Sequence, residues 1–248
     1  MAPEETRIQL CGRLVVELRG RRVEDSLPGR QGRLLFVYLA ANRLRPVTRG
    51  QLAAALWPEE APATADSALS ALLSKLRKAL GPETLEGRSE LRLLLPEGAW
   101  IDLEAAREGL HRAESAVARR VWAEAWGPAR VAQHVARRDF LPGEDAPWIE
   151  DVRRELDELH VRALECVARA CLALGGSELD TAERAARDLV RLAPYRESGY
   201  RHLMEVLAAR GNVAEALQVY EGLRLRLREE LGTAPSTPTQ ELHRRLLA

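Results

Sequence analysis

The stretch that most constrains the fold is Ala63–Leu80, ATADSALSALLSKLRKAL. Its leucines recur at spacings of three and four residues, which predicts an α-helix with one apolar stripe formed by Leu69, Leu72, Leu73, Leu76 and Leu80. The outward face carries small and basic side chains, with Arg77 at its edge: Ser67, Ser70, Ala71, Ser74, Lys75 and Lys78. Such a face can enter a DNA groove and meet phosphates. Taken alone, however, an ordinary amphipathic helix with a solvated charged face explains this pattern better.

The residues before this helix change that balance. Thr48-Arg-Gly-Gln51 has the sequence of a capping box, in which two side chains satisfy two backbone amides reciprocally. A short helix follows with Leu52, Ala55 and Leu56 inward, and Trp57-Pro58 ends it because the residue before a proline disfavours helical geometry. A short capped helix, a turn and a longer helix with a basic face together predict a helix-turn-helix.

The flanking segments extend this unit. Arg7–Cys11 and Leu14–Leu18 predict paired strands, and Gly29–Asn42 predicts a helix. After the long helix, Thr84–Glu86 and Leu91–Leu95 predict a hairpin with Arg88 at its tip, and Ala99–Ile101 predicts a further short strand. A hairpin directly after a recognition-type helix is the arrangement of a winged helix, although an ordinary connecting hairpin explains it about equally well by itself.

From Asp102 onward the pattern is nearly all helical. The predicted helices are Leu103–Ala118, Trp122–Ala136, Trp148–Leu174, Leu179–Leu192, Glu197–Ala209, Val213–Leu231 and Thr237–Leu247, with Gly127-Pro128 as a break. Ala182, Ala186 and Leu189 match the second helix of a tetratricopeptide repeat, and Ala216, Tyr220 and Leu223 repeat the pattern 34 residues later. Stacked helical pairs are therefore expected, with a generic helical bundle as the alternative.

Length and charge fit two domains, which we place at residues 1–101 and 102–248. The net charge of zero hides a mild asymmetry, because residues 1–101 contain 15 Arg/Lys and 12 Asp/Glu.

No apolar run is long enough for a membrane span, and the acidic N-terminus does not resemble a signal peptide. The three cysteines fit neither a zinc site nor a disulfide framework, so we expect a soluble protein of the reducing cytoplasm.

The sequence offers no catalytic pattern. Its five histidines lack metal-binding spacing, and the phosphate-loop, dinucleotide-binding and nucleophile-elbow motifs are absent. The acidic clusters of the second half interleave with arginines, as on solvated helix faces. We therefore expect a protein that is not an enzyme and has no metal site.

Several stretches together resemble one family, the bacterial transcriptional activators of the antibiotic regulatory protein type, called SARP. The matching stretches are Gly29–Leu35, Gln51–Trp57, Ala68-Leu69 with Leu73–Gly81, Ala214–Tyr220, and Glu229–Gly232 with Pro235. The resemblance implies a mostly α fold with a small β component, in which an N-terminal OmpR-type winged helix-turn-helix precedes an all-α tetratricopeptide-like bacterial transcriptional activator domain. It also implies binding to double-stranded promoter DNA, recruitment of RNA polymerase and no cofactor. The sequence does not decide between a monomer and a homodimer.

The expected DNA site combines the outward face of the long helix with arginines around it. We expect phosphate contacts from Arg43, Arg45, Arg49 and Arg88, and groove contacts from Ser67, Ser70, Ala71, Ser74, Lys75 and Lys78. Asp66 departs from the family's pattern, since such proteins often carry a basic residue where this helix begins. It motivates an alternative function, a protein-interaction adaptor whose winged helix has lost its affinity for DNA.

Overall fold

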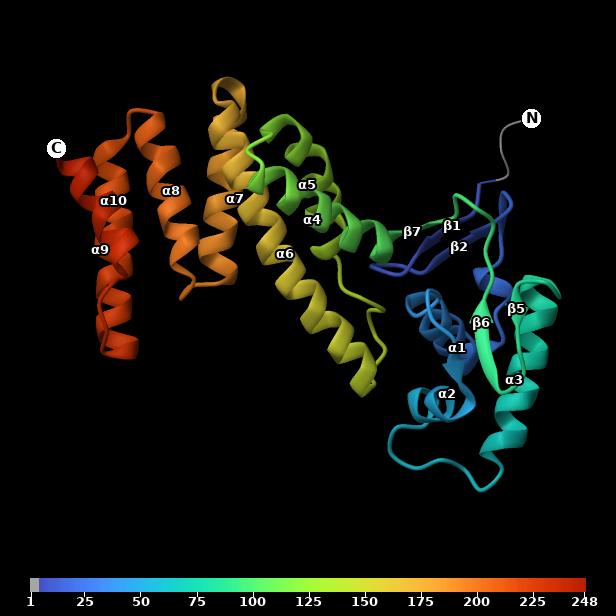
Figure 1. Cartoon of the computed structure of the whole chain (residues 1–248). Coiled ribbons are helices and arrows are strands. Elements are labelled where there is room, and N and C mark those ends of the chain that lie inside the picture. The colour runs from blue at the N-terminus through green and yellow to red at the C-terminus, as the bar shows by residue number, and fades with distance from the viewer. Residues whose placement is uncertain (1–4) are drawn as a thin grey trace. The chain divides into compact units, whose positions relative to one another are not determined.

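The computed structural model describes residues 5–248, which form two compact units (Figure 1). The first unit extends to Ala105 and takes in Val135–Leu156; the second combines Ala106–His134 with Asp157–Ala248. Helices α4 (Asp102–Ala118) and α6 (Pro147–Leu174) each contribute residues to both units. The division into independently folding halves at residues 101 and 102 stays a proposal.

The first unit begins with a four-stranded sheet of order β3-β2-β1-β7. Its strands are β1 (Arg7–Gln9), β2 (Val15–Leu18), β3 (Arg21–Arg22) and β7 (Trp100–Ile101). β1 pairs antiparallel with β2, as the sequence predicts, and parallel with β7, so the short strand predicted after the hairpin joins this N-terminal sheet. A short 3-10 helix, η1 (Glu24–Ser26), follows β3.

Three helices and a second sheet complete the winged helix-turn-helix. The helices are α1 (Gly29–Ala41), α2 (Arg49–Leu56) and α3 (Ala65–Leu80), and the sheet has the order β4-β6-β5 with β4 (Val47–Thr48), β5 (Leu85–Glu86) and β6 (Glu90–Leu93). The predicted capping box is confirmed at the start of α2, where Thr48 and Gln51 satisfy each other's backbone amides. β4 was not expected from the sequence, and it attaches the start of α2 to the hairpin.

The core of this unit is formed by the inward faces of the three helices. Four leucines of the predicted stripe on α3, Leu69, Leu73, Leu76 and Leu80, are buried, whereas Leu72 is half-buried. α3 contacts α1 and α2, whose Leu35, Leu39 and Leu52 are also buried, and each buried leucine contributes about 1.5–3 kcal/mol. The stripe therefore fixes which face of α3 remains outside.

A buried carboxylate attaches the sheet to the next helix. Asp102, at the start of α4 (Asp102–Ala118), is fully buried and accepts hydrogen bonds from the backbone amides of Leu10 at 2.9 Å and Cys11 at 3.0 Å. Burial raises the pKa of this carboxyl, while the amides and Arg138, 3.6 Å away, act in the opposite direction. Asp102 thus holds the end of β1 at a fixed place on α4.

Val135–Leu156 packs on the winged helix as part of the first unit. Phe140 is fully buried and bridges to Cys11, and the indole nitrogen of Trp148 donates to the carbonyl of Ala55 at 3.1 Å. Arg153 donates to the carbonyls of Phe140 and Leu141, which shapes the turn around this segment. Residues distant in sequence thereby complete the core around α1 and α2.

The second unit is helical throughout, apart from its turns. It contains most of α4, of α5 (Trp122–Ala136) and of α6 (Pro147–Leu174). The elements that lie wholly in it are η2 (Gly176–Glu178), α7 (Leu179–Leu192), α8 (Glu197–Ala209), α9 (Val213–Leu231) and α10 (Thr237–Leu247). The predicted break at Gly127-Pro128 is wrong, because α5 continues through Pro128. Tertiary packing explains this: a Cβ at Gly109 of α4 would lie 2.9 Å from the carbonyl oxygen of Pro128, so only glycine permits this close approach.

The predicted repeat positions all face the core. Ala182, Ala186 and Leu189 on α7 are fully buried, as is Ala216 on α9, whose small side chain suits close helix packing. Tyr200 packs with Leu223 and Leu227, and successive helices α7, α8 and α9 contact one another as in a helical repeat array. No helix in the part of the chain that the structure describes has the length and apolar composition to cross a membrane.

Candidate nucleic-acid interface

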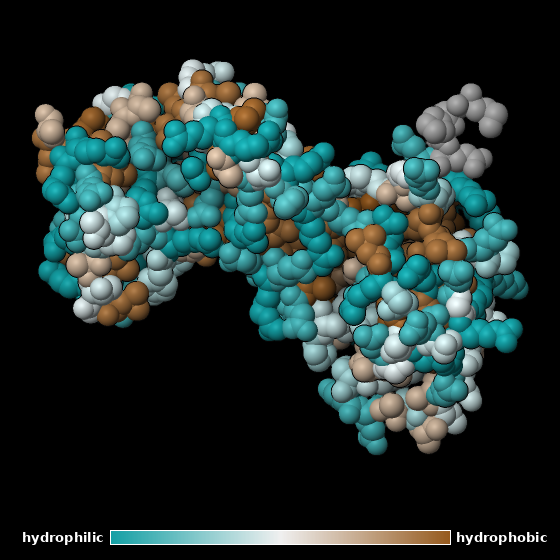
Figure 2. All heavy atoms as spheres, viewed as in Figure 1, coloured by the Kyte–Doolittle hydropathy of each residue, from teal (hydrophilic) through white to brown (hydrophobic). Residues whose placement is uncertain are grey.

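The outward face of α3 is a nearly continuous polar surface. All six residues that the sequence assigned to it, Ser67, Ser70, Ala71, Ser74, Lys75 and Lys78, are exposed. Because the leucine stripe is buried, this face is the only side of the helix that can approach a groove. Figure 2 has the same view as Figure 1 and shows the surface around α3 mainly in teal and white, the colours of hydrophilic and intermediate residues. Light-brown, weakly hydrophobic residues lie near the loop that precedes α3.

Arg49 and Asp66 lie together at the start of this surface. The Arg49 guanidinium donates from Nε at 3.0 Å and from Nη2 at 2.8 Å to Oδ1 of Asp66, and from Nη2 to Oγ of Ser70 at 2.8 Å. It also donates to the backbone carbonyl of Asp66 at 3.1 Å. The side chain that begins α2 therefore binds the first turn of α3, and the negative charge of Asp66 has a direct cationic partner.

Arg77, at the edge of the outward face, holds the wing against α3. Its Nε donates to the carbonyl of Leu85 at 3.3 Å and its Nη2 to the carbonyl of Gly87 at 2.7 Å. Gly87 has φ of +93°, and a Cβ there would lie 1.8 Å from the carbonyl oxygen of Glu90, so the turn requires glycine. The backbone amide of Arg49 reaches the same tip through the carbonyl of Ser89 at 3.2 Å. Helix and wing tip are thus held in one fixed arrangement.

The other three arginines expected to bind phosphate differ in the contacts they make within the protein. Arg43 forms a bidentate salt bridge with Glu104, with both hydrogen bonds at 2.7 Å, and both side chains are largely buried. Arg45 donates twice to the side-chain oxygen of Asn42 and remains exposed. Arg88 is exposed at the wing tip, with no hydrogen bond or ion pair to another residue of the described range 5–248. Arg88 is therefore the arginine of this set most accessible to an external anion.

Across residues 5–248, no group of three His, Cys, Asp or Glu side chains is placed to hold a metal ion. What the site presents is a helix face of hydroxyl and ammonium groups beside an arginine-tipped hairpin. Such an arrangement suits recognition of a duplex, because helix residues read base edges while flanking cations bind phosphates.

Comparisons with known proteins agree with this architecture. Residues 101–247 match the family model described as "Bacterial transcriptional activator domain". The chain is 35% identical over 224 residues to "Regulatory protein AfsR" of Streptomyces coelicolor, covering 88% of this chain and 22% of that protein. It is 26% identical over 249 residues to "Transcriptional regulatory protein MoaR1" of Mycobacterium tuberculosis, covering 96% of this chain and 78% of that protein.

A solved structure shares the fold. "Mycobacterium tuberculosis EmbR in complex with low affinity phosphopeptide" superposes with a TM-score of 0.81 at 24% identity, over 98% of this chain and 65% of that chain. The chain spans about a fifth of the length of the AfsR relatives, since 22% of each is covered. These relatives are regulatory proteins rather than enzymes, in agreement with the sequence-based expectation.

Proposed function

The chain belongs to the SARP-type transcriptional regulators that carry a bacterial transcriptional activator domain, and from that membership we propose that it binds promoter DNA through α3 and the wing. The observation that carries this proposal is the exposed face of α3. The chain's only two lysines, Lys75 and Lys78, lie there beside three exposed serines, while the opposite face is buried. This placement gives α3 both of the properties that major-groove entry requires: close approach and positive charge.

The contacts around α3 divide into three roles. Lys75 and Lys78 are the candidates for base edges or phosphates along the groove, and Arg88 is the candidate for a phosphate beside the wing. Arg49 adjoins the groove face and Arg45 lies in the loop before α2, and both can exchange their present partners for phosphates. A phosphate at Arg43 would compete with Glu104. Groove contacts give sequence discrimination, and phosphate contacts give affinity that depends on salt.

The second part of the proposal concerns activation. The family's name and the stacked helices of the second unit support a role for α4 to α10 as a protein-contacting surface, with RNA polymerase as the partner. No cofactor enters this proposal. A homodimer on a two-fold-symmetric operator is the alternative to binding as a monomer.

A gel shift with the DNA upstream of the chain's own gene, followed by in vitro transcription from that DNA, tests both parts. The proposal expects a shifted band that weakens as salt rises, with log affinity falling by about 0.9 for each phosphate contacted per tenfold rise in salt. It also expects more transcript when the protein is added. DNA obtained by selection from a random library provides a second substrate.

One observation favours a second candidate, a protein-interaction adaptor. Arg43 and Arg49 are engaged by acidic partners, so the cationic surface is smaller than the number of arginines suggests. If neither the upstream DNA nor a library yields a salt-dependent complex, this adaptor function replaces the proposed one.

A further inference from the structure

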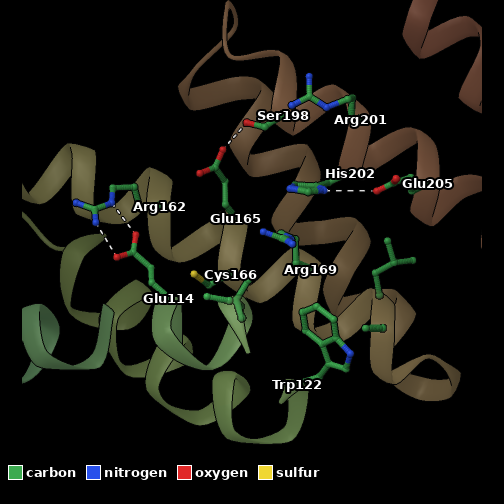
Figure 3. A pocket seen from close by; sticks show the side chains of 14 residues that line it. Glu114, Trp122, Arg162, Glu165, Cys166, Arg169, Ser198, Arg201, His202 and Glu205 are labelled. Atoms are coloured by element: carbon green, nitrogen blue, oxygen red, sulfur yellow. Dashed lines mark hydrogen bonds and ion pairs between the residues drawn. The ribbon is translucent and has the colours of Figure 1, made fainter. Parts of the chain in front are cut away.

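An open pocket lies within the second unit. Its volume is about 710 Å³, and side chains of α4, α5, α6 and α8 line it. Figure 3 shows Trp122 at one side, Arg201 at the other, and Arg169 and His202 between them. Pockets of about 300–1,000 Å³ are typical of small-molecule sites.

Two of the carboxylates of this pocket are already occupied. Glu114 accepts two hydrogen bonds from Arg162, at 2.8 and 2.7 Å, which use both of its oxygens. Glu165 accepts from the hydroxyl of Ser198 and, at 3.1 Å, from Nε of Arg196. Arg162 therefore neutralises Glu114, whereas Glu165 shares Arg196 with Glu158. Figure 3 shows the contacts of Glu114 with Arg162 and of Glu165 with Ser198.

The donors are only partly used. Arg169 is exposed on the pocket wall, and its guanidinium has no hydrogen bond or ion pair with any residue in the described range. Arg201 donates from Nη1 to the hydroxyl of Thr239 at 3.0 Å, and no other hydrogen bond of its guanidinium is seen within residues 5–248. Nδ1 of His202 is buried without a hydrogen-bond partner, 3.6 Å from Oε2 of Glu205. Glu205 is the third carboxylate of the lining, and no hydrogen bond of its side chain is seen within residues 5–248. Arg169 and Arg201 together nevertheless keep more unused N–H donors than Glu205 has acceptor sites.

We propose that this pocket binds a small organic anion that has one carboxylate or phosphate group and a flat apolar part. The oxyanion would be bound by Arg169 and Arg201, whose planar forks match carboxylate and phosphate oxygens. The flat part would lie against Trp122 and the neighbouring aliphatic lining. Cys166 also lines the pocket, but its thiol does not act as a nucleophile. Burial, and secondly the charge of Glu114, raise the pKa of this thiol to about 12, so it stays protonated.

The binding is therefore noncovalent and needs no metal or cofactor. It does not depend on the proposed DNA binding, since its residues lie in the second unit alone. A ligand there would add a chemical input to a regulator.

Calorimetric titration of the full chain with three matched probes tests the proposal: naphthalene-1-acetate, 1-naphthyl phosphate and the neutral naphthalene-1-acetamide. At least one of the two anions should bind one-to-one with a dissociation constant below about 1 mM, and the amide should bind at least about tenfold more weakly. A preference between the two anions identifies the headgroup as carboxylate or phosphate.

Variants localise the site. Arg169→Gln and Arg201→Gln should each weaken the preferred anion at least about fivefold while leaving the amide unchanged. Arg245→Gln, an exposed arginine on α10 outside the pocket, is the matched control and should bind as the unaltered chain does. Thermal melting shows whether each variant is folded. If Arg201→Gln does not fold, the anion affinity of Arg169→Gln alone tests whether the pocket is the binding site. The proposal is overturned if neither anion binds up to about 5 mM, if the amide binds as tightly, or if Arg169→Gln retains full affinity.

Discussion

Arg49 donates two hydrogen bonds, of 3.0 and 2.8 Å, to one oxygen of Asp66, and so joins the first residue of α2 to the first turn of α3. The Asp66 side chain is nevertheless 88% exposed, so the pair lies at the rim of the surface that would face DNA. A phosphate near this rim would compete with Asp66 for Arg49. The pair therefore controls both the local charge and the availability of one arginine.

Replacing Asp66 by Asn should strengthen DNA binding. The substitution removes a negative charge near the phosphates and releases Arg49 to contact them. We expect about two- to fivefold tighter binding, most visible at low salt where screening is weak. Fluorescence anisotropy at two salt concentrations measures the effect. Thr64→Ala, at the exposed N-cap of α3 whose side chain makes no capping hydrogen bond, is the control for a general disturbance of the helix start. Weaker binding by Asp66→Asn would mean that Arg49 must be held in place.

Replacing Arg77 should weaken DNA binding by releasing the wing. Its guanidinium joins α3 to the carbonyls of Leu85 and Gly87, and lysine cannot span both. Arg77→Lys and Arg77→Ala should therefore lose affinity to a similar extent, with little change in the salt slope. A lysine variant that binds normally would instead mark Arg77 as a source of charge alone.

Arg43 and Arg88 should behave differently despite their shared assignment from sequence. Arg88→Ala should weaken binding to all duplexes and reduce the salt slope by about 1, because Arg88 is free to meet a phosphate. Arg43→Ala should mainly lower the free energy of unfolding, by about 1.5–3 kcal/mol, because it leaves Glu104 without its partner. Parallel melting and binding measurements separate the two effects; equal loss of salt slope in both variants would show that Arg43 exchanges Glu104 for a phosphate.

The stability of the first unit should depend on Glu24 at acidic pH. Its carboxylate accepts hydrogen bonds from Arg22 and from the backbone amide of Val16, which lower its pKa from 4.5 to about 2. Because the folded pKa is lower than the unfolded one, this stabilisation is present above pH 4.5 and is lost as pH falls toward 2. Glu24→Gln should remove about 1–3 kcal/mol at neutral pH and progressively less below pH 4.5. Urea unfolding across this range, with the exposed Glu59→Gln as control, measures the profile; a pH-independent difference would assign the effect to packing.

Regular patterns in the sequence predicted most of the fold. Helices α7 to α10 begin and end at the predicted residues, because their apolar periodicity and their glycine and proline boundaries are strong local signals. The capping box of Thr48 and Gln51 is similarly local, since both residues lie in one turn. The exposure of the α3 face followed directly from its leucine stripe.

What the sequence did not reveal depends on contacts between distant residues. The carbonyl of Ala55 and the indole of Trp148 are separated by 93 positions, so no local pattern places Val135–Leu156 in the first unit. Two-residue strands such as β4 are too short to show alternation. The engagement of Arg43 by Glu104 and of Arg49 by Asp66 likewise requires the folded chain, and these contacts decide which arginines remain available.

The central claim is that the exposed face of α3 binds DNA, and Lys75 tests it most directly. Fluorescence anisotropy of the full chain with a duplex selected from a random library, at two salt concentrations, compares the unaltered protein with Lys75→Ala. Lys75→Ala should weaken binding by about 1–3 kcal/mol if the ammonium reads a base, or reduce the salt slope by about 1 if it meets a phosphate. Arg245→Ala, on the exposed face of α10, should change neither quantity. If Lys75→Ala leaves both affinity and salt slope unchanged, the duplex is bound elsewhere and the claim that the exposed face of α3 binds DNA is contradicted.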